Sequence, residues 1–319
     1  MAKYVYGVDI GGTTVKLGLF TDGGDVLDKW EIPTRTEDNG KNILPDIAKS
    51  VKEKTEEKGF SLSNVLGIGM CCPGPVDEAG MIHKAVNLGW GVFSITEEMK
   101  KYIDLPVYAG NDANVAALGE LWKGGGRGFK DVVVVTLGTG VGGGVIVNGK
   151  ILTGCIGAGG EIGHIHMIDD EEEACGCGNK GCLEQYASAT GIARLARRRL
   201  AKDDAESVLR NIPVSDINAK DVFDAVKAGD KVAVEIAEEF GMILGKGLAI
   251  IAGVTNPAIF VIGGGVSKAG EVVIDYIRKN YVKYVFHACR DTKFALATLG
   301  NDAGIFGSAK LVLDGVACS

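Results

Sequence analysis

Two neighbouring polar residues could handle a proton and a ligand rich in hydroxyl groups. Asn111 and Asp112 lie between an expected strand over 105–108 and an expected helix over 113–122. Ligands bind at the carboxyl ends of strands in α/β sheets, and a carboxylate there can accept a hydroxyl proton. The amide can both donate and accept hydrogen bonds. The same pair could instead only cap the helix, and the residues alone leave both interpretations open.

A second group combines carboxylates with an imidazole. Glu161 and His164 lie three residues apart after the glycine turn 157–160, and Glu184 lies further along the chain. Two carboxylates and an imidazole suit a ligand made of hydroxyl groups. A solvated acidic surface is the alternative, and it fits residues 169–173 better than Glu161.

Three clustered cysteines and an upstream histidine form a set of four potential metal ligands. Cys175, Cys177 and Cys182 come after both His164 and His166, so either histidine could complete a tetrahedral zinc site. The spacing differs from paired C-x-x-C knuckles, so scattered thiols remain an alternative. His83 has no evident partner. The other cysteines are interpreted as core or terminal residues without chemistry: Cys71, Cys72, Cys155, Cys289 and Cys318.

Three glycine turns could bring backbone amides close to phosphate groups. They read DIGGT at 9–13, GTGVGGG at 138–144 and GGG at 263–265. Glycine lets a polyphosphate approach because no Cβ intrudes. Any one turn could be a plain hairpin, but three in one chain, the first with the Asp9 carboxylate and the Thr13 and Thr14 hydroxyls, favour a nucleotide.

The residues around and after the second turn exclude two more familiar nucleotide motifs. The spacing of residues 138–143 matches the dinucleotide fingerprint, but the next expected element is a strand, where that motif requires a helix. Residues 144–150 resemble a P-loop, but Ile151 occupies the position of the Ser or Thr that would hold Mg²⁺.

The expected elements alternate between strands and helices, which predicts an α/β fold. A hairpin over 4–20 has a second copy over 132–147, so the chain consists of two related halves. Helical spacing marks residues 42–58, 187–201, 219–228, 231–252, 272–281 and 303–313, and strands are expected at 65–70, 105–108 and 259–262.

Composition limits the class of protein. The chain has 319 residues, 46% of them hydrophobic and 24% charged, which is enough for packed globular domains. A net charge of −7 without a basic cluster argues against nucleic acid as a partner. No apolar run approaches the ~18 residues of a membrane span, and eight cysteines are too few for a disulfide scaffold. We therefore expect a cytoplasmic protein with no membrane partner.

Together these motifs resemble the ROK family of the sugar kinase/Hsp70/actin superfamily, most closely its bacterial glucokinases. The resemblance covers nearly the whole chain. Besides the three glycine turns it rests on GIG at 67–69, PGPVD at 73–77, NLGW at 87–90, NDAN at 111–114, GEIGH at 160–164 and CGCGNKGCLE at 175–184.

The resemblance implies two ribonuclease-H-like α/β lobes with the active site in the cleft between them. The smaller lobe would comprise residues 1–112 plus 301–319. The larger would comprise residues 113–300, with a zinc-binding segment at 164–182. We also expect a homo-oligomer, either a dimer or a tetramer.

The resemblance further implies an ATP-dependent kinase that converts glucose to glucose 6-phosphate, with Asp112 as the catalytic base. The sugar would contact Gly74, Asn87, Asn111, Asp112, Glu161, His164 and Glu184. ATP, with Mg²⁺ held through water, would contact Asp9, Gly11, Gly12, Thr13, Thr139 and Gly140 through its phosphates and Gly264 and Gly265 through its nucleoside. Among the two histidines it favours His164, so that structural Zn²⁺ would be held by His164, Cys175, Cys177 and Cys182.

Two rival functions belong to the same family. One is a kinase for another sugar, such as N-acetylmannosamine, N-acetylglucosamine or fructose. The other is a sugar-sensing repressor, which would carry a winged-helix region ahead of the first glycine turn. That turn begins at Asp9 here, so we expect the kinase.

Overall fold

The computed structural model describes residues 2–318 and divides into two compact units. The first comprises Met1–Gly128, Lys150–Gly160 and Leu299–Ser319, and the second comprises Phe129–Gly149 and Glu161–Thr298. The first unit thus includes residues 113–128, which the family resemblance assigns to the other lobe. Each unit is described by itself.

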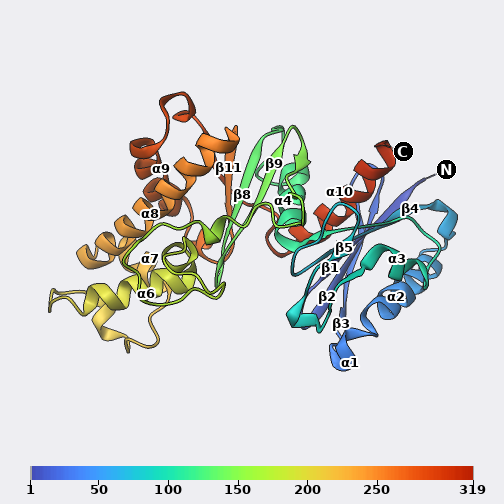
Figure 1. Cartoon of the computed structure of the whole chain (residues 1–319), viewed down its shortest axis with the longest axis horizontal. Helices are drawn as coiled ribbons and strands as arrows, with labels where there is room; N and C mark the ends of the chain where they lie inside the picture. Colours follow the sequence, from blue (N-terminus) through green and yellow to red (C-terminus); the bar gives the residue numbers. More distant parts are fainter. Residues whose placement is uncertain (1, 319) are drawn as a thin grey trace. The chain divides into compact units, whose positions relative to one another are not determined.

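The first unit is built on a five-stranded sheet with the order β3-β2-β1-β4-β7. Strands β1, β2 and β3 are antiparallel neighbours, whereas β4 and β7 continue the sheet parallel to β1 (Figure 1). The strands are β1 (Tyr4–Ile10), β2 (Thr14–Thr21), β3 (Val26–Pro33), β4 (Val65–Cys72) and β7 (Val107–Asn111).

Both faces of this sheet are covered because successive side chains of a strand point to opposite faces. Tyr6 and Val8 of β1 belong to a core cluster with residues of α2 (Ile43–Glu57), whereas Val5 packs with residues of α10 (Ala303–Cys318). The remaining elements of this unit are α1 (Glu37–Gly40), β5 (Met81–Ile82), β6 (Phe93–Ser94), α3 (Ile95–Lys100), α4 (Asp112–Lys123) and β10 (Lys150–Ile151).

The sheet of the second unit repeats this plan, with the order β9-β8-β11-β12. Strands β8 and β9 are antiparallel, and β11 and β12 continue parallel to β8, as β4 and β7 continue from β1. The two related halves and both hairpins of the predicted α/β fold are confirmed. The strands are β8 (Val132–Leu137), β9 (Val141–Val147), β11 (Ile259–Gly263) and β12 (Lys293–Leu296).

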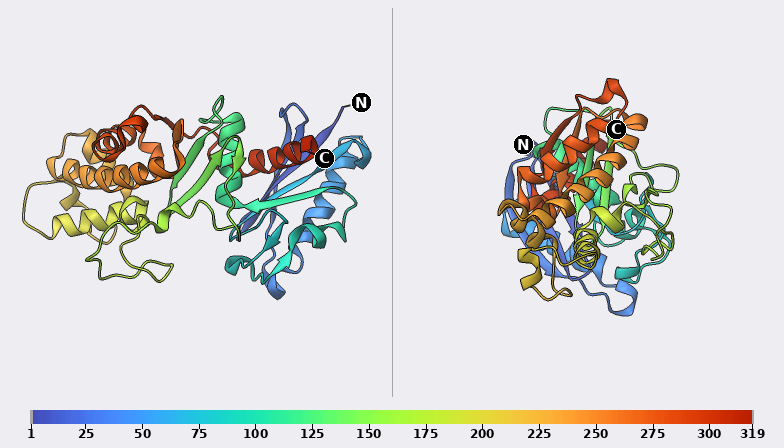
Figure 2. Two further views of the ribbon diagram at one scale, coloured as in Figure 1. Left: turned by 45° about the horizontal axis from the view of Figure 1, so that its top comes forward. Right: turned by 90° about the vertical axis from the view of Figure 1, so that its left-hand side faces the viewer.

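A layer of helices packs with the second sheet around one large core (Figure 2). The long helix α8 (Lys231–Thr255) packs most extensively on α9 (Glu271–Tyr284). Gly241 permits this close approach, since a Cβ there would lie 2.5 Å from the carbonyl oxygen of Tyr276. The other helices are α5 (Glu184–Ala187), α6 (Ala189–Leu200) and α7 (Ala219–Lys227). Among the residues that the structure describes, no helix has the length and apolar character needed to cross a membrane.

One local expectation is wrong: the second glycine turn is shorter than expected, because Leu137 pairs with Val141 and Gly142–Gly144 already belong to β9. The helix expected over 187–201 is present as α6, and it begins two residues later than expected. The Ser188 side chain accepts a hydrogen bond from the amide of Gly191, so it caps a new helix and ends the preceding turn.

Candidate active site

At the junction between β7 and α4, Asn111 and Asp112 occupy different structural positions. Asn111 is the N-cap: its Oδ1 accepts from the Asn114 amide at 3.1 Å, and its Nδ2 donates to the Gly74 carbonyl at 3.0 Å. Asp112 is the first residue of the helix and is exposed, and its Oδ1 accepts from the Ala113 amide at 2.8 Å. The helix dipole favours a negative charge at this position. The start of the helix therefore stabilises the ionised form of the Asp112 carboxylate, which is the form that a general base requires.

Gly74 is required by the loop that orients Asn111. Its φ is +95°, and a Cβ would lie 2.1 Å from the Lys84 carbonyl oxygen, so a larger residue would displace the loop. One N–H of the Asn111 amide donates to the Gly74 carbonyl oxygen, which fixes the orientation of the amide.

The first glycine turn connects β1 to β2 and leaves Gly12 and Thr13 exposed. The turn is closed by a hydrogen bond of 3.0 Å from the Gly11 amide to the Thr14 carbonyl. Asn87 lies beside it, since a Cβ on Gly12 would be 3.9 Å from the Asn87 Cβ. The structure therefore brings one expected sugar contact next to the expected phosphate contacts.

Asp9 lies at the end of β1, in a partly buried position. The Cys71 thiol is 3.3 Å from its Oδ1, and a Cβ on Gly304 of α10 would be 2.7 Å from its Cγ. Burial raises the pKa of the Asp9 carboxyl, and the Cys71 hydrogen bond and the charge of Lys16 oppose that rise. The sequence indicates no chemical role for Cys71, whereas the structure places its thiol against a candidate nucleotide residue, Asp9.

In the second unit, Glu184 links the glycine turn to the cysteines. Its Oε2 is 3.4 Å from the Val141 amide nitrogen, and its Oε1 is 2.9 Å from the Cys175 Sγ. A Cβ on Gly140 would lie 2.5 Å from Oε2, so a larger residue there would displace the Glu184 carboxylate. Thr139 is the exposed residue of this turn.

His164 lies between two carboxylates. Its Nδ1 is 3.8 Å from Glu184 Oε1, and its Nε2 is 3.8 Å from Glu161 Oε2. The structure thus brings together the three residues of the second unit that we expect to hold a sugar, and it orients the two ring nitrogens of His164 toward different neighbours.

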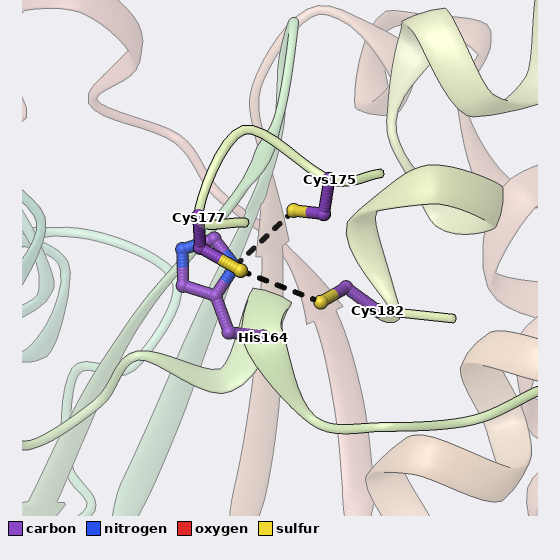
Figure 3. A group of neighbouring side chains, drawn as sticks. All are labelled: His164, Cys175, Cys177 and Cys182. Carbon is purple, nitrogen blue, oxygen red and sulfur yellow. Dashed lines mark hydrogen bonds between the residues drawn. The ribbon is translucent and has the colours of Figure 1, made fainter. Parts of the chain in front are cut away.

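The cysteine cluster has the composition and spacing of a tetrahedral zinc site (Figure 3). The ligand atoms of His164, Cys175, Cys177 and Cys182 all lie within 4.8 Å of one another. Cys177 Sγ and Cys182 Sγ are 3.7 Å apart, and so are Cys175 Sγ and His164 Nδ1. Zinc–sulfur bonds of ~2.3 Å in a tetrahedron separate sulfurs by about 3.8 Å, so these residues fit the ion.

The structure also distinguishes the two candidate histidines. Both ring nitrogens of His166 are used elsewhere: Nδ1 is 2.9 Å from the Lys180 carbonyl oxygen, and Nε2 is 2.9 Å from Asp169 Oδ1. The hydrogen bond to Asp169 raises the pKa of His166. His164 is therefore the histidine that belongs to the cluster.

Beside the third glycine turn lies a hollow of about 350 Å³ that the sequence did not reveal. Gly264, with φ +82°, packs against the backbone of Leu137, while Gly265 is exposed and lines the hollow. Phe223 and Val266 supply apolar surface there. These lining residues come from separate helices and loops and form no local motif, so no spacing could have identified them.

The comparisons with known proteins give the family. The model of the ROK family matches residues 5–315. The chain belongs to the ROK family. It is 43% identical to a glucokinase of Halalkalibacterium halodurans, over 97% of this chain and 95% of that protein. It is 37% identical to a glucokinase of Thermotoga maritima, over 96% of each chain.

Solved structures of ROK kinases share the fold. A ROK family glucokinase from Streptomyces griseus, in complex with glucose and AMPPNP, is 35% identical with a TM-score of 0.74, over 97% of this chain and 98% of that one. A ROK hexokinase from Thermus thermophilus is 30% identical with a TM-score of 0.82, over 99% of this chain and 100% of that one. The actin/hexokinase-like architecture that we expected is thus confirmed.

Proposed function

We propose that this chain transfers the terminal phosphoryl group of ATP to glucose and forms glucose 6-phosphate. The observation that carries this proposal is the 43% identity to a glucokinase over 97% of the chain. It is supported by the exposed Asp112 carboxylate at the start of α4, next to an Asn111 amide whose orientation is fixed. The chain is less similar to a putative xylose repressor of Caldicellulosiruptor sp., at 28% identity, and to a xylose repressor of Caldicellulosiruptor bescii, at 26%.

Asp112 is the catalytic base in this proposal. Its carboxylate takes the proton of the glucose 6-hydroxyl while that oxygen bonds to the terminal phosphorus, and the bond from phosphorus to the bridging oxygen breaks to release ADP. Asn111 and Gly74 hold the sugar together with Asn87, Glu161, His164 and Glu184.

The nucleotide would use all three glycine turns. Gly11, Gly12 and Thr13, with Thr139 and Gly140, would contact its phosphates, and Asp9 would hold Mg²⁺ through water. Mg²⁺ that arrives with ATP neutralises phosphate charge. Gly264 and Gly265 would line the nucleoside, whose base would occupy the hollow next to Phe223. A cytoplasmic location and a homo-oligomeric state, dimer or tetramer, remain predictions.

Zn²⁺ would be held by His164, Cys175, Cys177 and Cys182. Four protein ligands would complete a tetrahedral coordination and leave no open position for water, as in structural zinc sites. The ion would stabilise the 164–182 segment. His164 then faces Glu161 with its other ring nitrogen.

A sugar panel tests the substrate. With ATP and Mg²⁺ in an assay of ADP release, we expect glucose to give the highest kcat/KM among glucose, fructose, N-acetylglucosamine and N-acetylmannosamine. The assay without Mg²⁺ serves as the control and should give almost no ADP. If fructose or an N-acetylated hexosamine clearly exceeds glucose, the chain is a kinase for that sugar.

A single substitution tests the nucleoside hollow. Nothing lies within 4 Å of a Cβ on Gly265, so Gly265→Leu fits the backbone but projects into the hollow. We expect KM for ATP to rise at least ~tenfold, about 1.4 kcal/mol, while glucose affinity and melting temperature change little. Gly253→Leu, at an equally open and exposed position on α8, is the matched control. An unchanged KM for ATP in Gly265→Leu would place the nucleoside elsewhere.

A further inference from the structure

Asn114 is a buried polar residue on α4, two positions after Asp112. Its side chain is almost fully buried, with the residue only 3% exposed. Its Nδ2 donates to the carbonyl of Gly159 at 3.2 Å, whereas its Oδ1 is buried and has no hydrogen-bond partner among the described residues. Buried acceptors without a partner are rare because they lose their hydration without compensation. The unpartnered Oδ1 makes an asparagine costly at this position, and the one hydrogen bond of its side chain shown here is the one from Nδ2 to Gly159.

The partner of Asn114 lies in the 152–160 loop, which ends immediately before Glu161. The loop is closed by a hydrogen bond of 2.7 Å from the Gly159 amide to the Thr153 carbonyl. The loop also packs against Val76, which comes two residues after Gly74. Gly157 has φ +78°, and a Cβ there would lie 2.6 Å from the carbonyl oxygen of Val76.

These contacts form a closed ring within the first unit. The Asn111 amide holds Gly74, the chain continues to Val76, and Val76 contacts Gly157 of the loop. Two residues later Gly159 accepts the hydrogen bond from Asn114, which returns the ring to α4. A shift of the loop would therefore disturb the Gly74–Asn111 contact through two connections, one by way of Val76 and the other by way of Asn114.

We propose that Asn114 is a positioning residue that sets the affinity for the sugar. It closes the ring, so it holds the 152–160 loop against the helix that carries Asp112 and keeps Gly74 and Asn111 in place. Because its amide is buried, Asn114 acts through these residues and does not touch the sugar. The inference rests on the proposed function only for the identity of the sugar.

The first test compares Asn114→Ala with the wild-type protein. We expect KM for glucose to rise about three- to tenfold, the usual effect of losing one neutral hydrogen bond, while kcat and KM for ATP stay within about twofold. Hydrogen exchange at the Gly159 amide should become faster, since the loop loses its tether. Asn280→Ala is the control, because Asn280 is also a buried asparagine whose Nδ2 donates to a backbone carbonyl, that of Tyr276. It should lower stability without separating the two KM values.

A second variant disturbs a different contact of the same ring, the one between Gly157 and Val76. Gly157→Ala would push the loop away from Val76, and we expect the same selective rise in KM for glucose. The double variant should show less than the product of the two single effects, since both break one ring. If Asn114→Ala misfolds, Gly157→Ala and the milder Asn114→Ser provide the same measurements.

The outcomes separate this inference from the proposed function. If the wild-type protein phosphorylates glucose but Asn114→Ala leaves KM for glucose and the exchange of Gly159 unchanged, the positioning role is wrong. Equal losses in kcat and in both KM values would also overturn it, because they indicate a general structural defect. If the wild-type protein does not phosphorylate glucose, the proposed function fails, whereas the exchange measurement still tests the tether.

Discussion

Asp112→Asn is expected to lower kcat by at least ~100-fold, since general-base catalysis typically contributes ~10²–10⁴-fold. The substitution keeps the shape of the side chain and an oxygen that can accept from the Ala113 amide, so the start of α4 should be preserved. Asparagine cannot take the proton of the sugar hydroxyl. Glucose affinity measured by calorimetry should stay close to that of the wild-type protein, because binding precedes proton transfer.

The matched control for this variant is Asp230→Asn. Asp230 caps α8 through its carboxylate, which accepts from the Ala233 amide at 2.9 Å, and it belongs to neither candidate sugar nor nucleotide contacts. This control variant should lower the thermal stability slightly and leave kcat unchanged. If Asp112→Asn retains turnover close to that of the wild-type protein, Asp112 serves only as the first residue of the helix.

Cys177→Ala is expected to release zinc and to weaken glucose binding more than ATP binding. Loss of one of four ligands removes a large part of a metal interaction that is worth ~10–16 kcal/mol in small zinc domains. His164 would then lose the bond that fixes its ring and its tautomer, and its Nε2 would no longer be aimed beside Glu161. We expect KM for glucose to rise at least ~tenfold.

Metal content by mass spectrometry and glucose affinity by calorimetry check this result together. Cys289→Ala is the control, because Cys289 is buried in the core of the same unit but lies outside the cluster. It should lower the melting temperature and keep both zinc and glucose affinity. Purified wild-type protein without stoichiometric zinc, or a zinc-free variant with unchanged glucose affinity, would contradict the coupling.

Short-range sequence patterns were enough to predict both hairpins and the start of α4. Alternating apolar residues and short glycine turns indicated both hairpins, and the polar pair after β7 indicated the start of α4. The edge strands β3 and β12 were missed, since half-exposed strands carry little hydrophobic pattern. The start of α6 was placed two residues early, because the cap Ser188 stands between two strong helix formers, Ala187 and Ala189.

The site residues were found where their type was distinctive, and missed where only the fold assembles them. Cysteines, His164 and paired carboxylates indicate their chemistry by type. The residue types of Phe223 in the hollow and Asn114 in the ring indicate no role, because the neighbours that give them one lie far away in the sequence. Nor could spacing show that Cys71 contacts Asp9, a contact that arises from the parallel pairing of β1 with β4.

The central claim is that this chain phosphorylates glucose and that Asp112 takes the proton. The most direct test is ³¹P nuclear magnetic resonance of a mixture of ATP, Mg²⁺ and glucose, recorded with the wild-type protein and with Asp112→Asn. The account predicts that the wild-type protein converts the ATP signals to ADP and a phosphomonoester at the 6-position of glucose, and that Asp112→Asn does so at least ~100-fold more slowly. Inorganic phosphate in place of the sugar phosphate, or equal rates for the two proteins, would contradict it.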